Sequence, residues 1–354
     1  MQKIEIHHLG PIKEFTSDLL RMNLFIGEQA TGKSTICKSV YFFRMIKEEI
    51  IACLYDIATD GKLVSKNRFL DVLHRKIRDT FLQLFGVSWY LDEKLYMRYD
   101  YTDDIYLEIS FVDKQKSLAV QYSPLLHDSL HTLEEELAEK WRDLDRRDFS
   151  FAARERARVN REIRNRIEVL FKDFLSTYYI PAGRQLLTLL SRQKTKIDYD
   201  NIDLVNRRFM QFNESIQGYF EHGIKKAHEY YPSLERDFSA AEISQNLIRG
   251  LKGDYHNTRS GEYLIVGGEQ RIPINYASSG QQELLWLLNQ LYILMLRQER
   301  AFVIIEEPEA HIYPTLQKTV FEFIAEFANI NGSKVLVTTH SPYTLTVANA
   351  LYYG

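Results

Sequence analysis

The residues most suited to chemistry begin with the run FIGEQATGKST, residues 25–35. Gly27 is followed five positions later by Gly32-Lys33-Ser34, which is the spacing of a phosphate-binding loop. In such a loop backbone N–H groups surround a β-phosphate, the lysine reaches the β- and γ-phosphates, and the serine hydroxyl binds Mg²⁺. The residues expected to contact a nucleotide are Gly27, Gln29, Ala30, Thr31, Gly32, Lys33, Ser34 and Thr35. The alternative is a glycine turn beside a surface lysine.

Two adjacent acids follow an apolar run in FVIIEEPEAH, residues 302–311. A buried strand there would bring Glu306 and Glu307 to the carboxyl edge of a sheet, where α/β proteins bind ligands. We assign Glu306 to Mg²⁺, held through water, and Glu307 to the general base that orients and deprotonates the attacking water. Aspartate is commoner at the metal position, so Glu306 is a departure. An exposed acidic turn is the alternative.

Two further motifs carry candidate phosphate contacts. His340 ends a second apolar run in VTTHSPY, where it could hydrogen-bond or sense a γ-phosphate, although a lone histidine is more often structural. Ser279 and Gly280 precede an amphipathic helix in YASSGQQELL, and a helix N-terminus attracts phosphate. Because the chain already has one phosphate loop, the helix N-terminus at Ser279 and Gly280 is expected to serve a nucleotide held by another subunit. A plain N-cap serine is the alternative.

The elements that position these residues read as an α/β fold. Residues 22–26 form an apolar strand before the glycine loop, and a helix is expected over 33–47. The apolar runs at 301–307 and 334–340 suit buried strands of a parallel sheet. The remaining expected elements are a strand at 3–9, a helix at 66–85, an antiparallel meander at 95–122, charged helices over about 125–177, helix over 201–230, a hairpin at 263–274 turning at Gly267-Gly268, and a helix at 280–299.

The bulk composition sets limits on the class of protein. The chain has 354 residues, a net charge of −3 and two cysteines, which gives room for a large core and none for a disulfide framework. The sequence has no apolar run near the ~20 residues of a membrane span and no signal peptide. A cytoplasmic protein without a membrane partner is expected. Whether a C-terminal part follows the closing LYYG stays open.

A basic segment lies in the middle of the chain. Residues 140–172 contain eleven Lys and Arg against six Asp and Glu. The favoured interpretation is a solvated helical face with ion pairs four residues apart. The alternative is a binding site for DNA, RNA or an acidic partner, with contacts mainly to phosphate.

Taken in order, the phosphate loop, SSGQQE, apolar-EE-P and TTHS resemble the ABC-type ATPase head of the SMC-like and OLD-like group. The resemblance is greatest to anti-phage defence ATPases, namely the Septu and retron-associated ATPases, the PARIS ATPase and the ATPase half of OLD nucleases. It extends over residues 1–48, 176–187 and 239–347, with Gln29 in place of a common asparagine and SGQQ in place of SGGQ. It implies a P-loop NTPase with an ABC-ATPase head, a mixed sheet, an antiparallel meander and a short charged helical insertion.

The resemblance also implies how the residues are used. Two heads would enclose two ATP molecules, with Ser279 and Gly280 of one head on the γ-phosphate bound by the other. Glu307 would be the base and His340 the switch histidine. Gln185, after YYIPAGR, is a weak candidate for the glutamine that senses Mg²⁺. Along the chain we expect an N-terminal ATPase lobe (1–124), a helical insertion (125–238) and a C-terminal ATPase lobe (239–354).

The functional expectation is a slowly hydrolysing regulatory ATPase in anti-phage defence. It would form a homodimer or higher oligomer. Because the sequence shows no nuclease signature, it would control an effector on a separate chain, and the resemblance implies that this effector is a nuclease. The main alternative is an SMC-like ATPase for DNA repair or DNA clamping. A transporter subunit and a scaffold without turnover fit the motifs less well.

Overall fold

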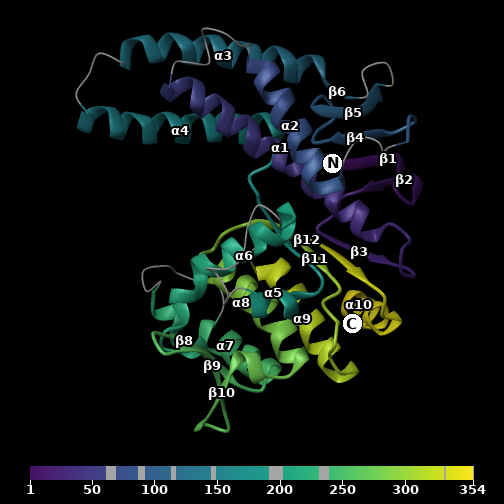
Figure 1. The fold of residues 1–354 in the computed structure, drawn as a ribbon, viewed down its shortest axis with the longest axis vertical. Helices are drawn as coiled ribbons and strands as arrows, with labels where there is room; N and C mark the ends of the chain where they lie inside the picture. The colour runs from purple at the N-terminus through teal and green to yellow at the C-terminus, as the bar shows by residue number, and fades with distance from the viewer. Residues whose placement is uncertain are drawn as a thin grey trace. The chain divides into compact units, whose positions relative to one another are not determined.

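The computed structural model describes residues 1–60, 69–86, 92–112, 117–144, 149–190, 202–230, 239–330 and 332–353 (Figure 1). The chain forms two compact units, and each is described by itself. Unit 1 comprises Met1–Leu20 and Ala30–Phe174, and unit 2 comprises Arg21–Gln29 and Leu175–Gly354. These units cut the chain differently from the expected segments 1–124, 125–238 and 239–354, because the first part of the helical insertion packs with the N-terminal helix and the rest packs with the C-terminal motifs.

Unit 1 contains a five-stranded antiparallel sheet in the order β2-β1-β4-β5-β6. Its strands are β1 (Lys3–Leu9), β2 (Ile12–Asp18), β4 (Tyr96–Asp100), β5 (Tyr106–Val112) and β6 (Ser117–Tyr122). The predicted first strand and meander are therefore confirmed. Strand β2 was not predicted. Among the described strands it pairs with β1 alone, and it has few apolar residues, as is usual for an edge strand.

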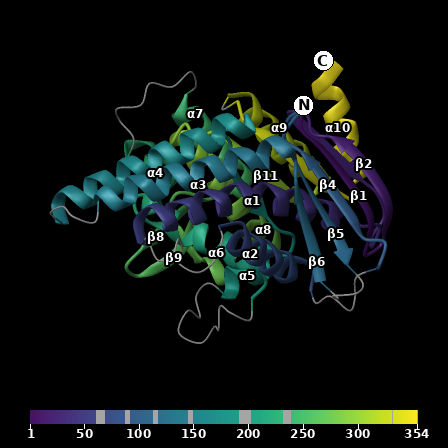
Figure 2. The same ribbon diagram turned by 90° about the horizontal axis from the view of Figure 1, so that it is seen from above.

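The helices of unit 1 pack around a long first helix. They are α1 (Lys33–Asp60), α2 (Phe69–Phe85), α3 (Pro124–Leu144) and α4 (Phe149–Phe171). Helix α1 contacts the other three, and α3 and α4 run alongside it in both views (Figures 1 and 2). It continues beyond the predicted end at residue 47 because Ile50, Leu54 and Ile57 extend its buried stripe.

A buried polar cluster joins the parts of unit 1. The Arg44 guanidinium lies 2.8 Å from the Asp173 carboxylate and donates to the Gln2 side-chain oxygen at 3.0 Å. The Tyr99 hydroxyl donates to the same Gln2 oxygen at 3.0 Å, and the Lys47 ammonium donates to the Asp173 carbonyl at 3.0 Å. Burial lowers the pKa of Lys47. Because the cluster takes residues from α1, β4 and the segment after α4, it fixes these elements against one another.

Unit 2 is built on a four-stranded parallel sheet in the order β3-β12-β11-β7. The strands are β3 (Met22–Ile26), β12 (Lys334–Thr339), β11 (Ala301–Glu306) and β7 (Ser176–Ile180). The predicted parallel arrangement of the apolar runs is confirmed. All six residues of β11 are buried, as expected for a strand covered on both faces. Strand β7 was not predicted, and it follows the charged helices, whose expected end at about residue 177 overlaps its first two residues. The parallel and antiparallel strands of this α/β fold lie in separate sheets.

The other elements of unit 2 surround this sheet. The helices are α5 (Arg184–Leu190), α6 (Leu204–Ile216), α7 (Ala240–Leu251), α8 (Ser279–Leu296), α9 (Pro314–Ile330) and α10 (Pro342–Tyr353). Strands β8 (Asp254–Thr258), β9 (Gly261–Val266) and β10 (Gln270–Pro273) form a small antiparallel sheet. The predicted hairpin is confirmed as β9 and β10, with Gly267 and Gly268 at positive φ in its turn.

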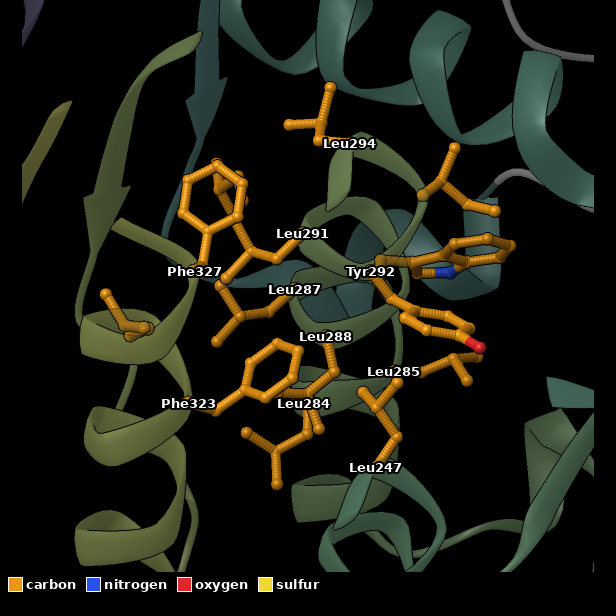
Figure 3. Packing of buried hydrophobic residues seen from close by; sticks show 14 of the residues in the cluster. Leu247, Leu284, Leu285, Leu287, Leu288, Leu291, Tyr292, Leu294, Phe323 and Phe327 are labelled. Carbon is orange, nitrogen blue, oxygen red and sulfur yellow. The ribbon is translucent and has the colours of Figure 1, made fainter. Parts of the chain in front are cut away.

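Helix α8 is the centre of the core of unit 2 (Figure 3). Every residue from Gln282 to Leu296 is buried, so the helix is enclosed on all sides. Figure 3 shows its leucines between Phe323 and Phe327 of α9 on one side and Leu247 of α7 on another. Burying one such side chain contributes about 1.5–3 kcal/mol, so α8 is held rigidly in unit 2. No helix among the described residues is long and apolar enough to cross a membrane.

Candidate functional site

The carboxyl edge of the parallel sheet gathers several of the predicted residues. Strand β11 ends at Glu306, which pairs with Thr338 of β12, and Ile26 at the end of β3 pairs with Thr339. The loops that leave this edge are therefore those carrying Gly27, Glu307 and His340, together with the Pro181–Gly183 loop after β7. Parallel strands place all their carboxyl ends at one edge, which explains why motifs far apart in the sequence meet here.

Glu306 is buried, and one of its two carboxylate oxygens accepts a hydrogen bond. Its Oε2 accepts a hydrogen bond from the backbone N–H of Ala182 at 3.3 Å. Its Oε1 is buried and has no hydrogen-bond partner in the described part of the chain. A buried carboxylate oxygen without a partner is costly unless a ligand satisfies it. Glu306 thus has a free acceptor at the position predicted for the metal.

Glu307 makes a direct contact with His340. The Glu307 Oε1 lies 3.1 Å from His340 Nε2, and both side chains are about one third exposed, at 37% and 28%. Glu307 has a positive φ of 44°, in the left-handed region that non-glycine residues rarely adopt. Its backbone N–H still donates to the Thr338 carbonyl at 2.9 Å. This turn ends the strand alternation and leaves two successive acids with different surroundings.

Glu309 is a residue of this edge that the sequence analysis missed. Its Oε1 accepts from the Thr339 hydroxyl at 2.6 Å and from the backbone N–H of His340 at 2.8 Å. Its Oε2 is buried and has no hydrogen-bond partner among the residues that the structure describes. Glu309 therefore fixes the end of β12 relative to the turn after β11. The signal was present in the sequence as the third acid of EEPE, two positions after Glu307.

The N-terminus of α8 uses its two serines differently. Ser278 is the N-cap: its hydroxyl accepts from the backbone N–H of Gln281, and the Gln281 side chain accepts from the backbone N–H of Ser278. Ser279 is the first residue of the helix and is exposed. A Cβ at Gly280 would lie 2.9 Å from the His311 carbonyl oxygen, so only glycine fits there. The capping role proposed as an alternative thus falls on Ser278, and Ser279 remains available.

The phosphate loop crosses from one unit to the other along its own backbone. Gly27–Gln29 follow β3 in unit 2, and Ala30–Gly32 precede α1 in unit 1. The predicted strand–loop–helix order is confirmed. Ala30 and Gly32 have positive φ, and a Cβ on Gly32 would lie 2.7 Å from Ile12 Cγ1. Lys33 opens α1 and is largely buried, whereas Ser34 is exposed.

Comparison with known proteins settles the class of this chain. A family model described as AAA ATPase domain matches residues 1–345. The chain belongs to this AAA ATPase domain family. An AAA ATPase domain binds nucleotide and hydrolyses ATP, so the protein is an ATPase. No curated protein matches the chain.

Several solved structures are similar to this ATPase at low identity. A structure of the SmcHead bound to the C-winged helix domain of ScpA is 14% identical, covers 98% of this chain and 90% of that one, and has a TM-score of 0.45. The SMC head domain from Thermotoga maritima is 10% identical, with coverages of 98% and 90% and a TM-score of 0.41. The Smc head domain with an extended coiled coil bound to the C-terminal domain of ScpA, derived from Pyrococcus furiosus, is 12% identical, with coverages of 98% and 92% and a TM-score of 0.43. Scores this low carry no argument about the function of this ATPase.

The donor set of the ATPase fits magnesium bound together with a nucleotide. Among the described residues no group of three or more His, Cys, Asp and Glu side chains could hold a metal ion. Magnesium is usually bound by one or two carboxylates plus substrate phosphates and water, not by a cage of protein ligands. The unpartnered Oε1 of Glu306 suits that arrangement.

A buried arginine of the ATPase was also missed by the sequence analysis. Arg184 and Glu283 are both almost completely buried, and the Arg184 Nε lies 3.2 Å from the Glu283 Oε2. Burial lowers the pKa of Arg184, and the charges of Glu283 and other nearby acids offset part of this effect. The backbone N–H of Gln185 donates to the Glu283 Oε1 at 3.1 Å. The suggested metal-sensing role of the Gln185 side chain stays a prediction.

The basic segment of the ATPase shows ion pairs within unit 1 where its side chains are described. Arg164 lies 2.8 Å from Glu48 of α1 and 3.6 Å from Glu168, four residues along α4. Arg166 pairs with Glu136 of α3. Residues 145–148 of the predicted segment lie outside the described residues. These contacts agree with the favoured interpretation of a solvated helical face, and a nucleic-acid site stays a hypothesis.

Proposed function

We propose that this protein is an ABC-type ATPase of the SMC-like and OLD-like group that acts in anti-phage defence. It binds ATP and Mg²⁺ between two copies of the chain, hydrolyses ATP slowly, and so controls a separate effector, a nuclease. The contact between Glu307 and His340 at the carboxyl edge of the sheet carries the hydrolytic part. The order of motifs supports membership of the group and the role in defence.

Glu307 acts as the general base in this proposal. Its carboxylate is partly exposed, so a water molecule can reach it, while its backbone is fixed on both sides by hydrogen bonds to Thr338 and from Arg184. The Nε2 of His340 is close enough to donate to this carboxylate and orient it. Proton transfer from water to Glu307 would then produce the nucleophile that attacks the γ-phosphate. His340 holds the base in place and faces the product phosphate.

The nucleotide and metal are assigned to the remaining motif residues. Lys33 contacts the β- and γ-phosphates, together with the backbone of the loop residues Gly27, Gln29, Ala30, Thr31, Gly32, Ser34 and Thr35. Ser34 and Glu306 hold Mg²⁺, Glu306 through water at its unpartnered Oε1. When bound, Mg²⁺ offsets the negative charge of the phosphates during hydrolysis. These assignments rest on the sequence motifs and on the family match.

The exposed first residue of α8 supports the enclosure of ATP between two copies. Because Ser278 caps the helix, the Ser279 hydroxyl and the helix N-terminus can face a ligand. The phosphate loop already provides one phosphate site in each chain, so Ser279 and Gly280 are assigned to the γ-phosphate bound by the second copy. The homodimer is the smallest assembly that completes both sites.

Trapping the dimer tests this function. Glu307→Gln should bind ATP without hydrolysing it and should run as a dimer in size-exclusion chromatography with light scattering when ATP and Mg²⁺ are present. Adding Ser279→Arg should return the protein to the monomer while ATP binding to the phosphate loop is retained. Lys33→Ala should remove binding itself. A Glu307→Gln protein that hydrolyses ATP at the parental rate would refute the assignment of the base.

The effector and the nucleic acid need separate experiments. Protection from phage that requires both this chain and a neighbouring nuclease gene, and is lost with Lys33→Ala, would support the defence role.

The SMC-like alternative expects DNA to stimulate hydrolysis. Replacing Arg154, Arg158 and Arg161 of α4 by Glu tests whether DNA binds this face, because these side chains are exposed. The variant should lose the stimulation of ATP hydrolysis by DNA. Unchanged DNA affinity in a salt titration would exclude this face as a nucleic-acid site.

Localisation follows from the same proposal. The two cysteines of the chain, Cys37 and Cys53, are buried and form no disulfide. Free thiols are usual in a reducing compartment. The proposal therefore places the ATPase in the cytoplasm.

A further inference from the structure

Arg184 hydrogen-bonds both the end of β11, which carries Glu306 and Glu307, and helix α8. Its Nη1 donates to the Glu306 carbonyl at 2.7 Å and to the Pro181 carbonyl at 2.8 Å, and its Nη2 donates to the Glu307 carbonyl at 2.9 Å. On the other side its Nε donates to the Glu283 carbonyl at 3.0 Å and pairs with the Glu283 carboxylate. One planar group thus spans from the end of β11 to the first turns of α8.

The Glu283 carboxylate closes the link from its own side. It accepts backbone N–H groups from Arg184 at 3.2 Å and from Gln185 at 3.1 Å, so it also fixes the loop that carries the arginine. Glu283 lies four residues after Ser279 on α8, which is one helical turn. Because Ser279 and Glu283 lie one turn apart in the same continuous helix, a displacement of the exposed tip by a bound nucleotide is transmitted to Glu283.

We propose that Arg184 is a positioning residue that couples the tip of α8 to the general base Glu307 of the same chain. The inference rests on the proposed function, in which the tip contacts the nucleotide held by the second copy. Arg184 then makes the position of one base depend on the nucleotide bound at the other site. It gives the dimer a route by which the two sites hydrolyse in a concerted manner.

The geometry of the arginine fits this role better than a general contribution to stability. A lysine could keep the charge, but a single ammonium cannot donate to the carbonyls of Glu306, Glu307 and Glu283 with the fixed angles of a guanidinium. A displacement of about 1 Å at a catalytic group can lower the rate about 100-fold. Loss of the Arg184 guanidinium should therefore lower the rate of the chemical step more than it weakens nucleotide binding.

Two conservative variants test the coupling: Arg184→Lys keeps the buried pair of opposite charges, whereas Glu283→Gln keeps the size of the side chain and removes the charge opposite Arg184. Arg184→Lys and Glu283→Gln should each lower kcat about 10- to 100-fold, while KM for ATP stays within about twofold of the parental value. The double variant should be no worse than the poorer single variant, because the two residues act as one unit. Arg21→Lys is a control for the exchange of arginine for lysine, since the exposed Arg21 also donates to two carbonyls, those of Ala328 and Asn329, but lies before the start of β3.

Hydrogen exchange gives a readout that does not depend on turnover. A non-hydrolysable ATP analogue should slow the exchange of the Arg184 and Gln185 amides about tenfold in the parental protein and in Arg21→Lys. The same analogue should leave their exchange unchanged in Glu283→Gln. If Glu283→Gln responds like the parental protein, or if Arg184→Lys keeps the parental kcat, the coupling is refuted while the proposed function stands. If the Glu307→Gln protein forms no ATP-dependent dimer, the proposed function fails and this inference fails with it.

Discussion

Replacing Glu309 tests whether the turn after β11 positions the end of β12. Its Oε1 accepts two hydrogen bonds, from the Thr339 hydroxyl and from the backbone N–H of His340. Hydrogen bonds to a charged group contribute about 1.5–3 kcal/mol each in the folded state. The site is partly exposed, so water can replace part of this, and the lower limit is appropriate. Glu309→Ala should lower the free energy of unfolding by about 3 kcal/mol.

Glu309→Gln separates the charge from the geometry. Its amide oxygen can keep both donors at the strength of neutral hydrogen bonds, about 0.5–1.5 kcal/mol each, so the loss of stability should be about 1–2 kcal/mol. Activity should fall as well, because His340 contacts Glu307 directly. A barrier increase of about 1.4 kcal/mol corresponds to a tenfold lower kcat, which is the effect expected for Glu309→Ala.

Urea unfolding followed by circular dichroism, together with steady-state ATP hydrolysis, measures both quantities. Thr339→Val is the comparison variant, since it removes one of the two donors and leaves the His340 backbone bonded to Glu309. It also removes the acceptor of the Ser341 backbone N–H, so it should cost about 2–3 kcal/mol, one hydrogen bond to a charged group and one neutral hydrogen bond. If Glu309→Ala unfolds at the same urea concentration as the parental protein and keeps its kcat, Glu309 positions nothing and the reasoning is wrong.

Three further predictions follow from single positions. Gly280→Ala should reduce ATP-dependent dimer formation at least tenfold, measured by light scattering, because its Cβ would lie 2.9 Å from the His311 carbonyl oxygen and displace the tip of α8. Burial raises the pKa of Tyr99 to about 12, so the stability it contributes is complete below pH 10 and is lost between pH 10 and 12. The midpoint temperature of thermal unfolding should therefore fall less steeply over that pH range in Tyr99→Phe than in the parental protein. Leu291→Ala in the core of α8 should lower the unfolding free energy by about 2–5 kcal/mol in urea titrations.

The parallel sheet and its edge could be predicted because each motif combines a local pattern with a chemical group. The apolar runs of β11 and β12 end in Glu306 and His340, and parallel strands bring such ends together. The phosphate loop carries its own glycine spacing. These signals lie within about ten residues of sequence, so no tertiary information was needed.

The residues that the sequence did not reveal depend on long-range contacts. Arg184 and Glu283 are 99 positions apart. They end the segments YYIPAGR and SSGQQE, but nothing in either segment shows that the two side chains pair. Strand β2 is an edge strand with a weak apolar pattern, and β7 follows a long charged stretch that resembles helix. The length of α1 depends on packing with α2, α3 and α4. In each case tertiary contacts decided the outcome over local preference.

The place of β3 in the parallel sheet has a consequence for biosynthesis. Asn23 of β3 hydrogen-bonds the carbonyl of Val335 in β12, 312 positions later in the chain. A ribosome that adds about 5–20 residues per second has therefore released β3 long before its neighbour emerges. During that interval β3 has no strand to pair with, and unpaired strand edges are prone to aggregation. The newly made chain should thus depend on chaperones until β12 has been made, and the phosphate loop after β3 becomes anchored only then.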